Sequence, residues 1–91
     1  MESNIISVKY EDRYIPKIFT GKAYTYYTAV NVKVGDLVIA PTSYGDKIAR
    51  VSEINIPQSN VEMIIPHLKL ITTKIDKVKY LQTNEVFKEV A

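Results

Sequence analysis

The chain has 91 residues, of which 46% are hydrophobic and 24% are charged, and these values fit one folded domain, residues 1–91, with a single apolar core. Cysteine is absent, which excludes a disulfide scaffold and a thiolate metal site. The formal net charge of +2 permits contact with a polyanion but does not require it.

Two stretches in the first third of the chain are predicted to be strands. Residues 5–10, with the sequence IISVKY, are mostly β-branched or aromatic. Residues 19–28 contain AYTYYT, which favours a sheet over a helix. Because side chains alternate along a strand, Tyr24 and Tyr26 should lie on one face and Tyr27 on the other.

Residues 32–54, VKVGDLVIAPTSYGDKIARVSEI, predict a strongly bent hairpin of the kind found in small β-barrels. Gly35 can adopt the positive φ of a tight entry turn, and Asp36 can accept a hydrogen bond from the turn backbone. Gly45 and Asp46 should do the same at the second corner. These two corners therefore set the ends of the central strands.

The two hairpin strands are predicted at residues 37–40 and 47–54. Pro41 should end the first strand, because proline cannot donate a hydrogen bond to a neighbouring strand. Strict alternation in the second strand would place Ile54 on the face opposite Val51. Either both faces are partly covered or a β-bulge shifts the alternation.

The remaining third of the chain predicts one more strand and a helix. Residues 55–60 should form a loop, and residues 61–65 an apolar turn that ends at Pro66. Residues 68–75, LKLITTKI, should form the last strand and close the barrel. Asp76 is a suitable N-cap for a short helix over about residues 77–90. The fold class is therefore mainly β: a small β-barrel of about five strands with a C-terminal helix.

The sequence has no recognisable catalytic or cofactor-binding motif. His67 is the only histidine, and a single histidine without cysteines or clustered carboxylates cannot assemble a metal site. The three glycines stand apart, so no phosphate-binding loop or dinucleotide fingerprint is present. Turn formation already accounts for Asp36 and Asp46. We therefore expect no enzymatic activity, no cofactor and no metal.

Seven tyrosines, several of them near basic residues, are the main candidates for function. The second strand and the central hairpin should be neighbours in a meandering sheet. They can therefore form one binding face, which consists of Lys22, Tyr24, Tyr26, Tyr44, Lys47 and Arg50. In a nucleic-acid complex the rings would stack on bases, and in a protein complex Tyr and Arg would anchor the partner. The alternative for Tyr24 and Tyr26 is packing in the core, whereas Tyr44, at a turn, should be exposed.

The central block resembles a known small-barrel pattern. It runs from KAYTY at residues 22–26 through VGDLVI at 34–39 to YGDKIARV at 44–51. This pattern is similar to the N-terminal DNA-binding domain of the primosomal helicase PriA and to the PSP1 domain, which implies an SH3-like or PriA-like barrel. Over about residues 5–82 the chain is most similar to small bacteriophage proteins of this barrel type. No residue of a base-binding pocket can be matched by position.

Two functions are therefore expected from the sequence. The first is a non-enzymatic binding protein of bacteriophage or mobile-element type that binds a host or phage protein through an exposed strand edge or through the tyrosine-rich face. The alternative is a barrel that binds single-stranded or end-containing DNA or RNA. A structural role in a virion would require self-association and stays open. No segment reaches the roughly 18 apolar residues of a membrane span and the N-terminus lacks signal-peptide features, so we expect a soluble protein in the cytoplasm, that of the host cell if the chain is phage-encoded.

Overall fold

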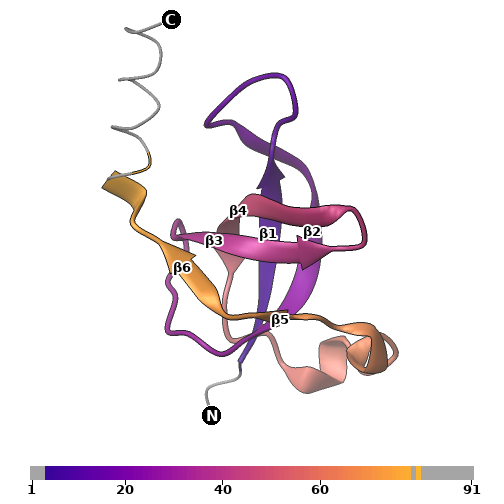
Figure 1. Cartoon of the computed structure of the whole chain (residues 1–91). Coiled ribbons are helices and arrows are strands. Elements are labelled where there is room, and N and C mark those ends of the chain that lie inside the picture. The colour runs from indigo at the N-terminus through magenta and orange to yellow at the C-terminus, as the bar shows by residue number, and fades with distance from the viewer. Residues whose placement is uncertain (1–3, 79, 81–91) are drawn as a thin grey trace, which may run out of the picture.

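The computed structural model describes residues 4–78 and 80. Its strands form one curled six-stranded sheet (Figure 1). Its elements are β1 (Ile5–Glu11), β2 (Phe19–Thr28), β3 (Leu37–Thr42), β4 (Gly45–Glu53), the short 3₁₀ helices η1 (Gln58–Asn60) and η2 (Ile65–His67), β5 (Leu70–Ile71) and β6 (Thr73–Ile75). The strand order is β5-β2-β1-β4-β3-β6. Among the described strands, only β2 and β5 pair in parallel, so the sheet is mixed. The prediction of a mainly β chain is confirmed.

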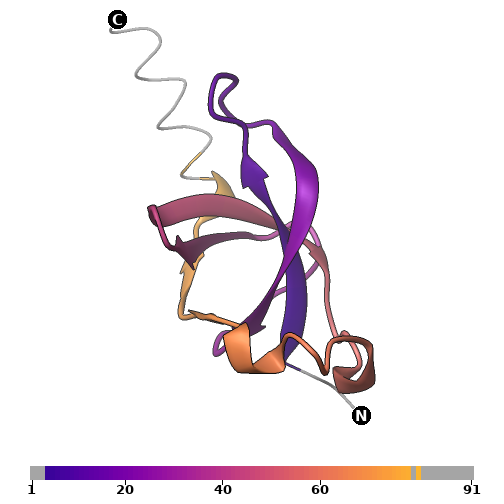
Figure 2. The same cartoon turned by 90° about the vertical axis from the view of Figure 1, so that its right-hand side faces the viewer.

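The sheet does not close into a barrel, so that part of the prediction is wrong. The predicted last strand, residues 68–75, is divided at Thr72 into β5 and β6, which lie at opposite edges of the sheet. β5 pairs with β2 only at Tyr27 and Thr28, and β6 pairs with β3 only at residues 37–39. Figure 2 shows the resulting curl, in which β3 and β4 cross β1 and β2. The last segment is too short to extend along both edges, which leaves part of each edge uncovered.

The predicted C-terminal helix, over about residues 77–90, lies mostly outside the described residues. Lys77, Val78 and Tyr80 have helical backbone, and the Tyr80 N–H donates to the Asp76 carbonyl at 2.9 Å. The Tyr80 hydroxyl donates to the Glu11 carboxylate at the end of β1. These contacts attach the end of the described chain to the sheet.

The Gly-Asp corner forms as the sequence predicts. Gly35 has φ +97° within the turn that precedes β3. The Lys33 N–H donates to Asp36 Oδ2 at 2.8 Å, and the Gly35 N–H and Val51 N–H form 2.8 Å hydrogen bonds that join the turn to β4. The backbone contact with Lys33 and the nearby Lys74 ammonium, whose Nζ is 3.2 Å from Asp36 Oδ2, lower the pKa of Asp36.

The β3–β4 hairpin is tighter than predicted. β3 continues through Pro41 to Thr42, which pairs with Gly45, so that Ser43 and Tyr44 form the tip. Gly45 has φ +110°, and the Thr42 hydroxyl accepts the Tyr44 N–H at 3.1 Å. Pro41 is tolerated inside the strand because β6 pairs with β3 only as far as residue 39, so the missing N–H lies on an uncovered edge.

Both explanations offered for the alternation of β4 hold in part. Ile48, on the face opposite Ala49, is half-buried, and a β-bulge shifts the alternation further along the strand. Ser7 lies opposite Glu53 but the next residue, Val8, lies opposite Val51, so Ser52 is the extra residue. The shift brings Ile54 to the same face as Val51, where it packs against the core. The buried core consists of Ile6, Val8, Tyr26, Val38, Ala40, Ala49, Val51 and Ile71.

Candidate functional site

A row of aromatic and basic side chains crosses three neighbouring strands on the core-facing side of the sheet, and we call it the tyrosine-lysine cluster. It contains Tyr10 of β1, Lys22, Tyr24 and Tyr26 of β2, and Lys47 of β4. The rings of Tyr10 and Tyr24 stack with their centroids 4.6 Å apart and an interplanar angle of 15°. Lys22 Nζ lies 5.8 Å from the Tyr24 centroid and Lys47 Nζ lies 5.3 Å from the Tyr10 centroid. Each stacked ring therefore also attracts a lysine ammonium, a contact typically worth about 0.5–1 kcal/mol at exposed sites.

Strand register explains why these side chains meet. Val8 lies opposite Tyr24, and Tyr10 lies opposite Ala49. Tyr10 is therefore a diagonal neighbour of both Tyr24 on one side and Lys47 on the other. The face predicted from the sequence lacks Tyr10, although the alternation that places Val8 in the core also places Tyr10 on the same face.

Tyr26 belongs to the core, as the core-packing alternative predicts. Its side chain is only 5% exposed, whereas that of Tyr24 is 41% exposed. The Tyr26 hydroxyl donates to the Pro41 carbonyl at 2.9 Å and lies 2.5 Å from the Tyr10 hydroxyl. Burial, with a smaller effect of Tyr10, raises the pKa of Tyr26 far above its usual range, so this phenol keeps its proton. Tyr26 thereby joins β2 to β3, which are not neighbours in the sheet.

The other two predicted residues lie outside this cluster. Tyr44 is 93% exposed at the hairpin tip, as expected, and borders a hollow that it shares with Lys47. Arg50 lies between Ala49 and Val51, both fully buried, so its side chain points to the opposite face of β4. The predicted face is therefore divided between the two sides of the sheet.

Part of β2 forms an uncovered strand edge beside the cluster. The Tyr27 N–H donates to the Lys69 carbonyl at 3.0 Å, so the backbone of Tyr27 faces away from β1. Because backbone groups alternate between the two sides of a strand, the N–H and C=O groups of Ala23 and Thr25 also face away from β1. Within the described part of the chain, no strand pairs with Ala23 or Thr25 on that side. We call residues 23–25 the β2 edge.

A hollow of about 320 Å³ lies beside the β2 edge. It is lined by residues 24–26 of β2, residues 41–43 at the end of β3, Tyr10, Ile64 and residues 67–69. On the β3 side, Pro41 has no N–H and its carbonyl already accepts the Tyr26 hydroxyl. Of the two strands that border the hollow, β2 is thus the one with backbone donors and acceptors available to a partner.

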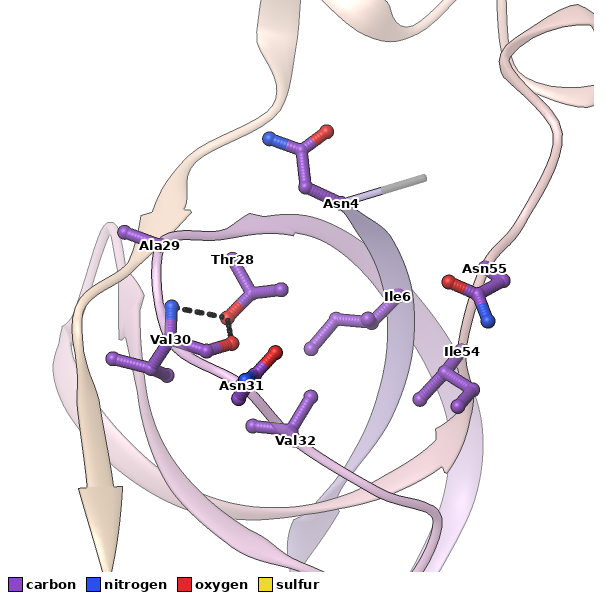
Figure 3. A pocket seen from close by; sticks show the side chains of 9 residues that line it. All are labelled: Asn4, Ile6, Thr28, Ala29, Val30, Asn31, Val32, Ile54 and Asn55. Carbon is purple, nitrogen blue, oxygen red and sulfur yellow. Dashed lines mark hydrogen bonds between the residues drawn. The ribbon is translucent and has the colours of Figure 1, made fainter. Parts of the chain in front are cut away.

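A third hollow, of about 540 Å³, has a different chemistry (Figure 3). Its apolar wall includes Ile6 and Ile54, and amide side chains lie around it: Asn4, Asn31 and Asn55. The Thr28 hydroxyl within it is already bonded to both the N–H and the C=O of Val30, at 3.1 and 2.9 Å. The residues that line this hollow include no ionisable side chain, so they offer neutral hydrogen bonds only.

No protein-family model, curated protein or solved structure matches this chain. The site must therefore be interpreted from its own residues. Among the described residues, no three His, Cys, Asp or Glu side chains are grouped as metal ligands. In the same part of the chain, no helix has both the length and the apolar character needed to cross a membrane.

The β2 edge and the tyrosine-lysine cluster provide means of binding. The edge offers backbone N–H and C=O groups that a partner strand can pair with, and the rings offer apolar contact. Positive charge comes from three lysines: Lys22, Lys47 and Lys69. None of these three lysines has a carboxylate partner among the described residues, whereas Lys74 is paired with Asp36. The arrangement therefore suits an extended ligand that hydrogen-bonds through its backbone and carries negative charge.

Proposed function

We propose that this chain is a non-enzymatic binding domain that takes an extended segment of a partner protein as an additional strand along the β2 edge. The observation that carries the proposal is that no described strand pairs with the outer side of Ala23 and Thr25, which lie beside an open hollow. Proteins commonly recognise extended peptides by adding a strand to such an edge. Each new hydrogen bond contributes about 0.5–1.5 kcal/mol net, so contacts with the cluster must supply part of the affinity.

The proposed partner is a protein of a host cell or of a bacteriophage. This part of the proposal comes from the resemblance of about residues 5–82 to small bacteriophage barrels, and with it we propose that the protein acts in the cytoplasm of the host cell. Strand addition suits such a role, because it can occlude or redirect a partner without any chemical step.

The proposal can be tested with a displayed library of random 12-residue peptides selected against the full chain. We expect selected peptides to bind and to slow amide hydrogen exchange at Ala23 and Thr25. Thr25→Pro should weaken binding about tenfold or more, because it removes a donor that faces the peptide. The N–H of Thr25 points away from β1, so this change spares the β1–β2 hydrogen bonds.

Thr25→Val is the matched control, since valine keeps both the N–H and the strand preference. It should bind the selected peptides like the unmodified chain. Equal affinity of Thr25→Pro and Thr25→Val for these peptides would show that they bind elsewhere, and the proposed site would then be wrong.

A nucleic-acid-binding function is the second candidate, and the stacked Tyr10–Tyr24 pair with a lysine at each end favours it. Fluorescence anisotropy with labelled single-stranded, duplex and 3′-ended DNA and RNA tests it directly. If nucleic acid is the partner, affinity should fall steeply with salt, and Lys22→Glu with Lys47→Glu should weaken binding and flatten the salt dependence. Absence of binding at low salt would exclude this candidate.

A further inference from the structure

We infer that the segment bound at the β2 edge is acidic, with carboxylates that pair with Lys22 at one end of the edge and Lys69 at the other. This inference rests on the proposed strand addition and specifies the chemistry of the partner.

The two lysines are placed at the ends of the uncovered edge. Lys22 directly precedes Ala23, and the Lys69 carbonyl accepts the N–H of Tyr27, where β5 begins to cover β2. The distance along β2 from Ala23 to Tyr27 is about 13 Å at 3.3 Å per residue. A partner strand of about five residues therefore spans the stretch of β2 between the backbone positions of the two lysines.

The charges around the hollow are unbalanced. His67 and Lys69 are among its lining residues, and no Asp or Glu is. Lys22 and Lys47 do not line it, but their ammonium groups lie over the rings of Tyr24 and Tyr10, which do. None of the three lysines has a carboxylate partner among the described residues, and the carboxylates nearest to Lys47 line the neighbouring hollow rather than this one. An acidic segment in this hollow therefore meets attraction from its lining, whereas a basic segment meets repulsion.

The backbone of the site favours a peptide over a nucleic acid as the source of this negative charge. Ala23 and Thr25 each present an N–H and a C=O on the same side of β2. A peptide strand satisfies both kinds of group, whereas a phosphate backbone only accepts hydrogen bonds and would leave the carbonyls unpaired. The exposed part of the Tyr24 ring then provides apolar contact for a side chain of the peptide.

The experiment uses the full chain and the random 12-residue peptide library. Clones are retained if they bind the unmodified chain and lose binding to Thr25→Pro. We expect Asp and Glu to be enriched in these clones. For the tightest peptide, replacement of its carboxylates by the corresponding amides should weaken binding about tenfold.

The lysines are tested in the same assay. Lys22→Gln with Lys69→Gln should lower the affinity for the acidic peptide about tenfold, since two exposed ion pairs each contribute several-fold. Lys74→Gln is the matched control, because it removes the same charge at the opposite edge of the sheet, where Lys74 pairs with Asp36. It should leave the affinity unchanged.

The outcomes separate the two proposals. Retained clones that are neutral or basic would overturn the acidic inference and leave strand addition in place. If no clone depends on Thr25, strand addition fails and the inference fails with it. If single-stranded oligo-dT binds more tightly than any peptide and Lys22→Gln weakens that binding, the lysines serve phosphates and the inference is overturned.

Discussion

Replacement of Tyr26 by phenylalanine removes one hydroxyl from the point where β2 is joined to β3. That hydroxyl donates to the Pro41 carbonyl at 2.9 Å and lies 2.5 Å from the Tyr10 hydroxyl. The ring itself stays in the core, so Tyr26→Phe tests the hydrogen bonds without a change in packing volume. We expect the variant to fold and to be less stable.

The expected loss follows from the burial of this group. Tyr26 is 5% exposed, so water does not readily replace it as the partner of Pro41. Removal of one partner of a buried hydrogen bond costs about 1–3 kcal/mol. A loss of about 2 kcal/mol lowers Tm by about 8–16 °C in a domain of this size. Urea and thermal denaturation, followed by circular dichroism, measure both quantities.

The stability of the Tyr26→Phe variant should also depend less on alkaline pH. The pKa of Tyr26 is raised in the folded state from its ordinary value of 10.0. A group with a raised folded pKa contributes stability below its unfolded pKa, and this contribution is lost as pH rises beyond 10. The unmodified chain should therefore lose stability between about pH 9 and 11 more steeply than the variant does.

Tyr27→Phe is the control, because Tyr27 lies on the same strand with its side chain on the other face. Its removed hydroxyl makes no contact with Pro41, so the change in unfolding free energy should stay within about 0.5 kcal/mol. The proposed role of the Tyr26 hydroxyl would be refuted if both variants lost the same free energy of unfolding. It would also be refuted if the stability of Tyr26→Phe fell with alkaline pH as steeply as that of the unmodified chain.

Three further predictions concern the turns and the bulge. Gly35→Ala should lower the free energy of unfolding, measured by urea denaturation, by about 1–2 kcal/mol, because alanine is strained at φ +97°. The loss would come from the backbone alone, since the new Cβ would meet nothing closer than 3.9 Å. An unchanged urea midpoint would contradict the turn geometry. The lowered pKa of Asp36 means that its stabilising contribution is present above its ordinary pKa of 3.8 and is lost as pH falls through the folded value. Asp36→Asn should therefore be less stable than the unmodified chain at pH 7, and this difference should shrink as pH falls below 3.8; a difference that does not change with pH would refute this assignment. Deletion of Ser52 removes the extra residue and leaves Ile54 two positions after Val51, still on the core face, so it should cost no more than about 1 kcal/mol, and a loss of several kcal/mol would contradict this register.

The sequence predicts the strands whose residues have strong local preferences. The stretches at residues 5–10 and 19–28 agree with β1 and β2 to within one residue. The two glycine corners are also correct, because a positive φ is a local requirement that few residues other than glycine meet. Local preference is therefore sufficient for this half of the fold.

The errors concern contacts between distant parts of the chain. Nothing local distinguishes one strand over residues 68–75 from two short ones, because the break at Thr72 depends on which edge each half reaches. The sequence alone does not predict the hydrogen bond from Tyr26 to Pro41, because that contact depends on the curl of the sheet. Tyr26 could therefore be placed either on the binding face or in the core. Arg50 could have been excluded from that face, since its neighbours Ala49 and Val51 are apolar and alternation places it opposite to them.

The division of the last strand between both sheet edges has a consequence for how the protein folds during synthesis. Leu70 pairs with Tyr27, and Ile75 pairs with Leu37, so these contacts link residues about 40 positions apart. A nascent chain can assemble β1 to β4 first, but it cannot cover either edge until residues 70–75 have left the ribosome. Until that moment both outer strands are exposed along their whole length, and this interval is when the chain is most open to aggregation or to capture by a chaperone.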